Sequence, residues 1–173
     1  MITEHLLKLG CRRIAFVGYP NSAATVTARI GGYRDALFTA GISVARDLVR
    51  TLENNQLNDV RMVMEKLKAD GIVCANDRTA GHLMHGLIQM NCRIPQDVRI
   101  VGIDDVEYAS LLPVPLTTVH QPCKEIGVAA VAAMLERVAA PGMPIRDILL
   151  DCNLVVRDSC GMKLGSAGVA GPV

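Results

Sequence analysis

The feature that most limits the fold of this chain is a repeated unit, in which a short, wholly apolar run is followed by an amphipathic segment. Residues 13–18 (RIAFVG) form the first run, and the residues after it repeat apolar side chains every three or four positions as far as Gly41. A continuous apolar run of this length is typical of a strand buried on both faces, whereas the spacing that follows is typical of a helix. A glycine directly after the last periodic residue is a common helix stop.

The unit recurs along the first two thirds of the chain. Residues 48–52, 71–75 and 98–103 are further short apolar runs, and the first two are followed by helical apolar spacings. Strands that alternate with helices need crossover connections, which favour a parallel sheet covered by helices on both faces. The predicted fold class is therefore α/β, with a doubly wound parallel sheet.

The last third of the chain has a different pattern. Prolines at 113, 115 and 122 disfavour helix between residues 105 and 122, so an extended crossing segment is expected there. Residues 123–140 are helical in pattern but carry two apolar stripes, so both faces of this helix require cover. Residues 148–156 are predicted to form a final strand, and the Gly/Ala-rich residues 161–173 a disordered tail.

Composition restricts the class of protein. The chain has 173 residues, enough for one domain with a substantial core, and no apolar run long enough to span a bilayer. Its N-terminus does not have the pattern of a secretory signal, and its six cysteines include no C-x-x-C pair, so the cytoplasm is the expected location. A net charge of +1 provides no basic face for nucleic acid.

Polar residues follow the apolar runs. The run GIVCA ends in Asn76 and Asp77, and residues 98–103 run into Asp104 and Asp105. In a parallel sheet the carboxyl ends of the strands share one edge, where ligands bind. These amides and carboxylates therefore predict a site for a small polar molecule. An alternative interpretation is that Asn76 and Asp77 only cap the next helix.

The sequence does not contain the motifs that enzymes usually use for catalysis or cofactor binding. The loop after the first strand is neither a dinucleotide-binding nor a phosphate-binding sequence, and no G-x-S-x-G elbow is present. His82 and His85 share a helical face without a third metal ligand, and Cys74 has no histidine nearby in sequence. Neighbouring residues on a strand point to opposite sides, which argues against Asp104 and Asp105 as an acid/base pair. We therefore expect no catalytic residue, no metal and no cofactor.

Several ordered motifs resemble one known family. They are HLLxLGxRRIAFVG (5–18), ARxxGYRDALxxAGI (28–42), CAND (74–77), IPxDVxIVGxDD (94–105) and PLTTVxQP (115–122). Together they resemble the effector-binding core of the lactose and galactose repressor family of bacterial transcription regulators, over residues 2 to 161.

The resemblance implies a periplasmic-binding-protein-like fold in which two lobes close over an effector, while an N-terminal helix-turn-helix domain binds operator DNA. It implies that residues 1–121 form essentially one lobe, the C-terminal lobe, and the start of the crossing segment. Residues 122–142 would be a helix that belongs to an N-terminal lobe, most of which lies outside these residues, as does the helix-turn-helix. Residues 143–160 would be the return strand, and 161–173 the tail. That helix is expected to be poorly ordered or packed against another copy of the chain.

The resemblance also implies which residues bind the effector. The strongest candidates are Arg29, Asn76 and Asp104, with Gln121 at the crossing between lobes; weaker candidates are Thr25 and Asn54. Alternative interpretations are that Arg29 pairs with a surface acid and that Gln121 serves only the hinge.

The effector is expected to be a sugar or a related polar metabolite. Ala23 stands where purine-binding relatives place a basic residue, and Asn54 where relatives often carry an aromatic one, so a nucleobase is disfavoured. A solute-binding protein of a transport system is the alternative function, and a small α/β hydrolase or transferase a more distant one.

A homodimer is also implied. Its surface would lie on residues 78–90 and 106–113, with Leu83, Leu111 and Leu112 as apolar contacts. Charged replacements of Leu83 and Leu112 are expected to give a monomer.

Overall fold

The structure is a computed structural model that describes residues 1–19, 24–53 and 56–162. The strands are β1 (Ile14–Gly18), β2 (Val49–Thr51), β3 (Gly71–Cys74), β4 (Arg99–Asp104), β5 (Thr117–His120) and β6 (Asn153–Val155). The helices are α1 (Ile2–Lys8), α2 (Ala24–Thr39), α3 (Gln56–Arg61), α4 (Asp77–Gln89) and α5 (Cys123–Ala139). Short helical turns are η1 (Arg46–Leu48), the π-helical η2 (Met62–Leu67), η3 (Glu107–Ser110) and η4 (Asp158–Cys160).

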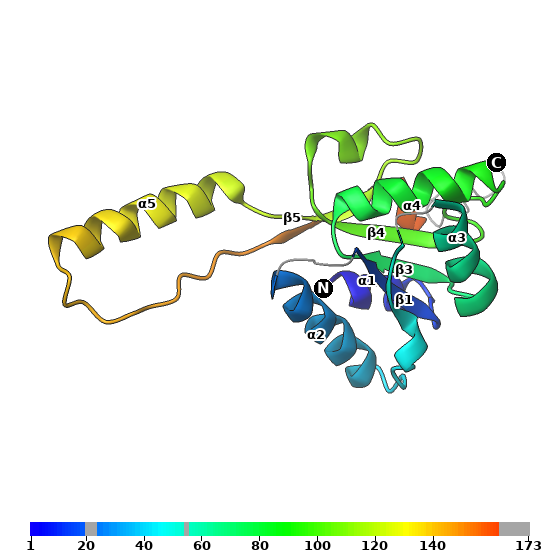
Figure 1. The fold of residues 1–173 in the computed structure, drawn as a ribbon, viewed down its shortest axis with the longest axis horizontal. Coiled ribbons are helices and arrows are strands. Elements are labelled where there is room, and N and C mark those ends of the chain that lie inside the picture. Colours follow the sequence, from blue (N-terminus) through cyan, green and yellow to red (C-terminus); the bar gives the residue numbers. More distant parts are fainter. Residues whose placement is uncertain (20–23, 54–55, 163–173) are drawn as a thin grey trace, which may run out of the picture.

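The strands form one sheet in the order β2-β1-β3-β4-β5-β6. The first five strands are parallel to their neighbours, and only β6 runs antiparallel to β5. Helices α1 and α2 cover one face of the sheet, and α3 and α4 cover the other (Figure 1). The predicted α/β class with a parallel, doubly wound sheet is confirmed.

Burial on both faces explains why the central strands are apolar at every position. Along β1, Ala15 and Val17 contribute to the core beneath α3 and α4, whereas Ile14 and Phe16 contribute to the core beneath α1 and α2. Strands β3 and β4 alternate in the same way. Because successive side chains on a strand point to opposite faces, a strand between two helical layers needs an apolar residue at each position.

A buried carboxylate joins the ends of three central elements. Asp77, the first residue of α4, is fully buried and accepts hydrogen bonds from Thr118 Oγ1 at 2.6 Å and from the backbone N–H of Val106 at 3.1 Å. Burial raises the pKa of this carboxyl above its ordinary value. The carboxylate lies against Gly102 of β4, where a Cβ atom would be 2.2 Å from Asp77 Oδ1. Glycine at 102 therefore makes room for the bonds that link α4, β5 and the loop after β4.

The chain returns to the sheet through β6 and η4. Ser159 accepts a hydrogen bond from the N–H of Thr117 at 2.9 Å and donates to the carbonyl of Ile100 at 2.6 Å, which fixes η4 beside β4 and β5. The predicted strand over 148–156 is too long, because only Asn153–Val155 pairs with β5. Residues 148–152 extend beyond the end of β5, where no described strand can pair with them.

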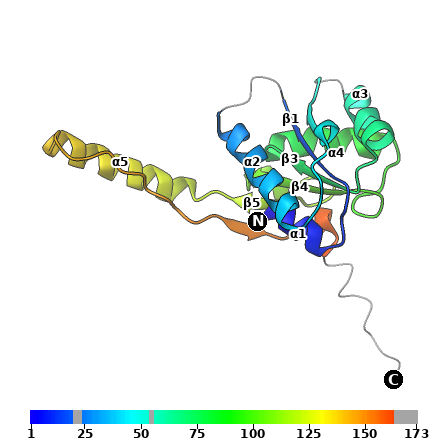
Figure 2. The same ribbon diagram turned by 90° about the horizontal axis from the view of Figure 1, so that it is seen from below.

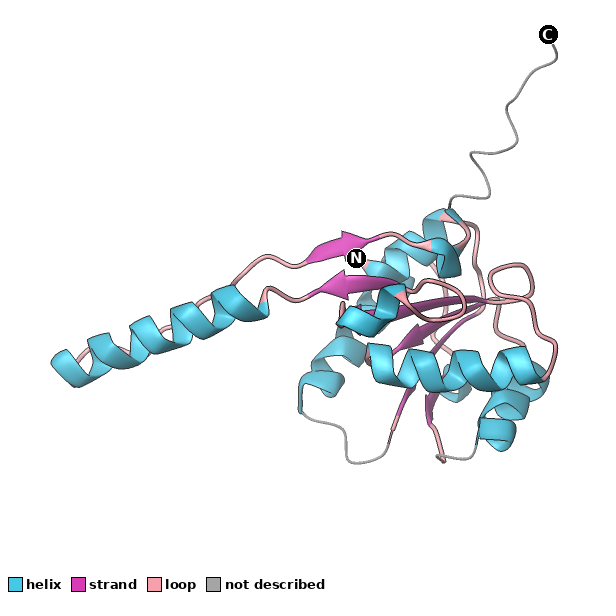
Figure 3. Cartoon of the chain, turned by 90° about the horizontal axis from the view of Figure 1, so that it is seen from above, coloured by secondary structure: helices cyan, strands magenta, loops and turns pink. Residues whose placement is uncertain are grey.

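Helix α5 stands away from the rest of the molecule. It leaves the sheet after β5, and an extended segment leads back to β6, so that the two form a projecting arm (Figures 2 and 3). None of its residues is buried, and most of its large apolar side chains, among them Val128, Leu135 and Val138, are more than half exposed. The helix forms but does not dock on the sheet. Among the helices described, none has the length and apolarity needed to cross a bilayer.

The close contact between Gly102 and Asp77 predicts that Gly102→Ala destabilises the fold. The added methyl would overlap Asp77 Oδ1 and lie 2.9 Å from Leu116, so we expect the free energy of unfolding to fall by about 1 to 3 kcal/mol in chemical denaturation. Gly31→Ala is the control, because a Cβ there meets nothing within 4 Å and alanine favours the interior of α2. Equal effects of the two substitutions would contradict the role given to Gly102.

Candidate functional site

Three polar side chains from separate parts of the chain meet at the carboxyl edge of the sheet. Asp104 is the last residue of β4, and its Oδ1 lies 3.3 Å from Arg29 NH2. Gln121, which follows β5, donates a hydrogen bond from Nε2 to the same oxygen. Arg29 comes from α2 and also donates to the carbonyl oxygen of Ala75, beyond the end of β3, at 2.5 Å. We call Arg29, Asp104 and Gln121 the rim cluster.

The rim cluster is half-buried and keeps unused hydrogen-bonding capacity. The side chain of Arg29 is 20% exposed and that of Asp104 is 30% exposed. Burial raises the pKa of the Asp104 carboxyl, while the charge of Arg29 and the hydrogen bond from Gln121 oppose this rise. Among the described residues, Asp104 Oδ2 has no hydrogen-bond partner. A free acceptor beside guanidinium donors suits a hydroxyl group, which both donates and accepts.

Backbone conformation separates the two carboxylates at the end of β4. Asp104 has φ +132° and Asp105 has φ +57°, both in the region that side-chain-bearing residues rarely adopt. Asp105 has partners outside the rim cluster, since its carboxylate lies 2.7 Å from Arg157 NH2 and 3.0 Å from His120 Nδ1. Such strain persists only where surrounding contacts impose it, and it is frequent at functional sites.

Asn76 serves as the N-cap of α4. Its Oδ1 accepts hydrogen bonds from the N–H of Thr79 at 2.9 Å and from Thr79 Oγ1 at 2.7 Å. Its amide nitrogen has no partner among the described residues, so it remains a donor at the same edge of the sheet. Thr25 is exposed on the first turn of α2 and makes no hydrogen bond to the rim cluster. Asn54 lies outside the described residues.

The other polar candidates do not converge. His82 Nδ1 lies 3.1 Å from the hydroxyl of Tyr19, and His85 Nε2 lies 2.9 Å from Gln89 Nε2. Within residues 1–19, 24–53 and 56–162, no three side chains of His, Cys, Asp or Glu are placed to hold a metal ion. Cys74 is fully buried, and burial raises the pKa of its thiol far above the ordinary value, so it stays a thiol.

Comparisons with known proteins agree with this geometry. The family model described as periplasmic binding protein-like domain matches residues 3–160, nearly the whole chain. The chain belongs to this family.

Named relatives of this periplasmic-binding-protein-like domain are transcription regulators. The chain is 31% identical to the HTH-type transcriptional repressor PurR of Vibrio vulnificus (strain CMCP6), over 92% of its own length and 49% of that protein. The chain thus spans about half the length of the curated relatives it matches.

Two solved structures show the same fold. A complex of the transcriptional regulator CelR with cellobiose superimposes with a TM-score of 0.82 at 27% identity, over 91% of this chain and 49% of that one. A LacI family transcriptional regulator from Enterococcus faecium with bound ribose gives a TM-score of 0.78 at 28% identity, over 91% and 60%. The resemblance to the lactose and galactose repressor family is confirmed.

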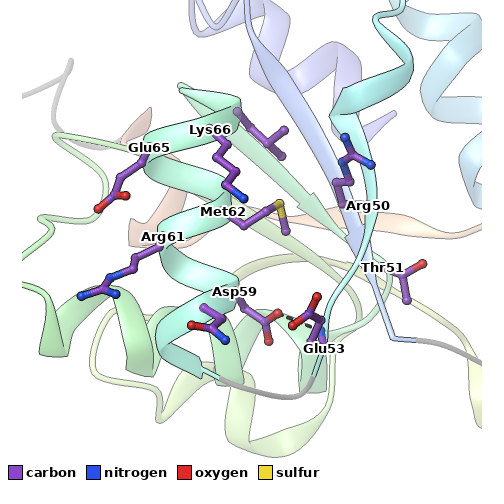
Figure 4. Close-up of a pocket in the computed structure, with 10 residues that line it drawn as sticks. Arg50, Thr51, Glu53, Asp59, Arg61, Met62, Glu65 and Lys66 are labelled. Carbon is purple, nitrogen blue, oxygen red and sulfur yellow. Dashed lines mark hydrogen bonds between the residues drawn. The ribbon is translucent and has the colours of Figure 1, made fainter.

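A cavity elsewhere in the periplasmic-binding-protein-like domain does not include the rim cluster. It has a volume of about 630 Å³ and lies between β2 and the helical segment α3–η2 (Figure 4). Its lining contains both acids and bases, and Arg61 and Glu65 point away from β2, while Asp59 accepts the N–H of Glu53 at 2.7 Å. Its charged groups do not converge on one point, so we assign the candidate site to the rim cluster.

Sequence reasoning found the three side chains of the rim cluster but missed the groups that hold it in place. The carbonyl of Ala75 carries no side-chain signal in the sequence. Arg157, which pairs with Asp105 and donates to the carbonyl of Leu116 at 2.8 Å, was also missed, although its position in the sequence indicates a role at the end of a strand. It is a charged residue directly after the apolar run LVV at 154–156.

We expect removal of the Arg29 side chain to change the pKa of Asp104. Because the guanidinium stabilises the ionised carboxylate, Arg29→Gln should raise the pKa of Asp104 further above its ordinary value. The titration can be followed by carboxyl ¹³C NMR. Arg34→Gln, an exposed arginine on the same helix, is the control and should leave the Asp104 titration unchanged. A titration insensitive to Arg29→Gln would show that the pair does not form in solution.

Proposed function

We propose that this chain is the effector-sensing and dimerisation part of a LacI-type, DNA-binding transcriptional regulator, and that its effector is a small polar molecule such as a sugar. The observation that supports this proposal is the convergence of Arg29, Asp104 and Gln121 at the carboxyl edge of a parallel sheet. In open α/β sheets ligands bind at this edge. The relatives are transcriptional repressors, a non-enzymatic family.

The chemistry of the rim cluster supports a hydroxyl-rich ligand. Asp104 offers an acceptor, and Arg29 and the amide of Asn76 offer donors, so adjacent hydroxyls of a sugar can be bound by paired hydrogen bonds. Cellobiose and ribose, which two structural neighbours hold, both have this chemistry.

The arm supports the proposed division into domains. We propose that residues 1–121 and 143–160 belong to one lobe, and that residues 122–142 pack on a second lobe. Both apolar stripes of α5 are exposed, and hydrophobic side chains of this number require cover in water. Only Pro122 separates Gln121 from this helix, so the second lobe would close directly over the rim cluster.

Operator DNA would be bound by a separate helix-turn-helix domain. The net charge of +1 gives this chain no basic face for DNA phosphates. A regulator of transcription acts where the chromosome lies, so we propose a cytoplasmic location.

We propose a homodimer formed through α4 and the loop at 106–113. The contribution predicted for Leu83 is wrong, because its side chain is only 2% exposed and packs in the core beneath α4. Leu112 is also partly buried against this core, and a Cβ atom at Gly81 would lie 3.4 Å from its Cδ2. Tyr108 and Leu111, which are 44% and 77% exposed, remain available for a partner.

Sugar binding tests the proposed function directly. We expect cellobiose or ribose to give saturable chemical-shift changes at the amides of residues 29, 76, 104 and 121, with a dissociation constant on the order of 1 mM, because one lobe supplies only part of the contacts. Arg29→Gln should abolish the changes, and Arg34→Gln on the same helix should preserve them. A sugar panel that leaves these amides unmoved would reject the assignment of the site.

Sedimentation velocity tests the dimer surface. Leu111→Glu places a charge on a side chain that already faces solvent, so we expect a folded monomer where the unmodified chain is a dimer. Phe38→Glu, at a side chain that is 82% exposed on α2, is the control and should leave the dimer intact. Dimers that persist in Leu111→Glu would place the interface elsewhere.

A further inference from the structure

A second cavity with one sign of charge lies at the opposite edge of the sheet. Its volume is about 540 Å³, and it is formed by the end of α1, the segment before β4 and the chain after η4. The lining residues are Lys8, Leu9, Pro95, Gln96, Arg99, Gly161 and Met162. Arg99 is the first residue of β4 and Asp104 the last, so this amino-edge cavity and the rim cluster are separated by the length of the strand, about 16 Å.

The amino-edge cavity carries two positive charges and no acidic lining residue. Lys8 is exposed at its mouth, and Arg99 is half-buried in its wall. The half-buried Arg29 and Arg157 each pair with a carboxylate, but Arg99 has no carboxylate within 4 Å among the residues that the structure describes. A guanidinium removed from part of its water needs compensation, which an anion provides.

The groups around Arg99 use only part of its hydrogen-bonding capacity. Its Nε donates to the carbonyl of Cys160 at 3.1 Å, and its NH1 lies 3.7 Å from the sulfur of Cys11. The nearby carboxylate of Asp70 is occupied by the backbone N–H groups of Arg12 and Arg13, at 2.7 and 2.9 Å. Arg99 NH2 has no partner in the described parts of the chain, so its donors remain for a ligand.

The backbone holds the guanidinium in position before any ligand arrives. Gly161 has φ +76°, and a Cβ there would lie 3.1 Å from Pro95 Cγ and 3.6 Å from Arg99 Nε. Glycine therefore allows the chain after η4 to pass close to Pro95 while the Cys160 carbonyl binds Arg99. A donor fixed in this way loses little conformational entropy when it binds.

We propose that the amino-edge cavity binds a small anion through a phosphate or carboxylate group. The guanidinium of Arg99 binds two oxygens of the anion, Lys8 supplies the second charge, and the amide of Gln96 adds a neutral donor. Leu9, Pro95 and Met162 offer apolar contact to the remainder of the molecule. The volume is that of a small-molecule site, and two cations are too few to bind a nucleic acid backbone.

Titration with inorganic phosphate at constant ionic strength tests the proposal. In ¹⁵N NMR spectra we expect saturable shifts at the amides of Lys8, Gln96 and Gly161 and at the Nε–H of Arg99, with a dissociation constant on the order of millimolar. Arg99→Gln should abolish saturation, and Lys8→Gln should weaken affinity several-fold. Arg61→Gln, at an exposed arginine beside the cavity between β2 and α3–η2, is the matched control and should leave the affinity unchanged.

Two further comparisons make the result decisive. Arg29→Gln disables the rim cluster and should leave phosphate binding intact, so failure of the sugar site and failure of the anion site are distinguishable. Lys8 is exposed, so Lys8→Gln decides the outcome even where Arg99→Gln does not fold. The proposal is overturned by shifts that do not saturate by about 50 mM phosphate, or by an affinity that Lys8→Gln leaves unchanged.

Discussion

The parallel pairing of β1, β3, β4 and β5 is the constraint on which the rest of the structure depends. Parallel strands place all their carboxyl ends at one edge and all their amino ends at the other. The rim cluster and the amino-edge cavity are the two consequences, since Asp104 and Arg99 are the opposite ends of β4. One strand with an apolar interior therefore carries an acidic group to one edge and a basic group to the other.

The polar pairs that end β3 and β4 divide their work between structure and binding. Asp77 is buried and bonded to Thr118 and Val106, and Asp105 is held by Arg157 and His120. Asn76 and Asp104 lie beside them with hydrogen-bonding capacity left. In each pair, one side chain fixes the backbone in place, so that the other presents its polar atoms at the edge without reorganisation.

Sequence patterns predicted the class of fold and the position of Asp104 because both follow from local features, whereas Arg29 and Gln121 were predicted only from the resemblance to the repressor family. Apolar runs mark the buried strands, and a polar residue after each run marks its carboxyl end. Leu83 shows where this reasoning fails: α4 is amphipathic, but the pattern does not say which apolar residues face the sheet and which a partner. The strand predicted over 148–156 is wrong at residues 148–152 for a similar reason, since an apolar extended segment becomes a strand only where another strand can pair with it.

The arm and the rim cluster are mechanically connected through very few bonds. Gln121 is bonded to Asp104 through its side chain and its backbone N–H, and it is followed after one residue by α5, so a displacement of α5 about this point acts on Asp104 through one residue. Asp105, next in sequence, is bonded to His120 on β5 and to Arg157 beyond β6. Strands β5 and β6 are the two strands that lead to the arm. A ligand at the rim cluster that binds one orientation of the arm more tightly than another would shift the arm toward that orientation. Coupling of this kind needs only a difference in the affinity of the ligand for two orientations of the arm.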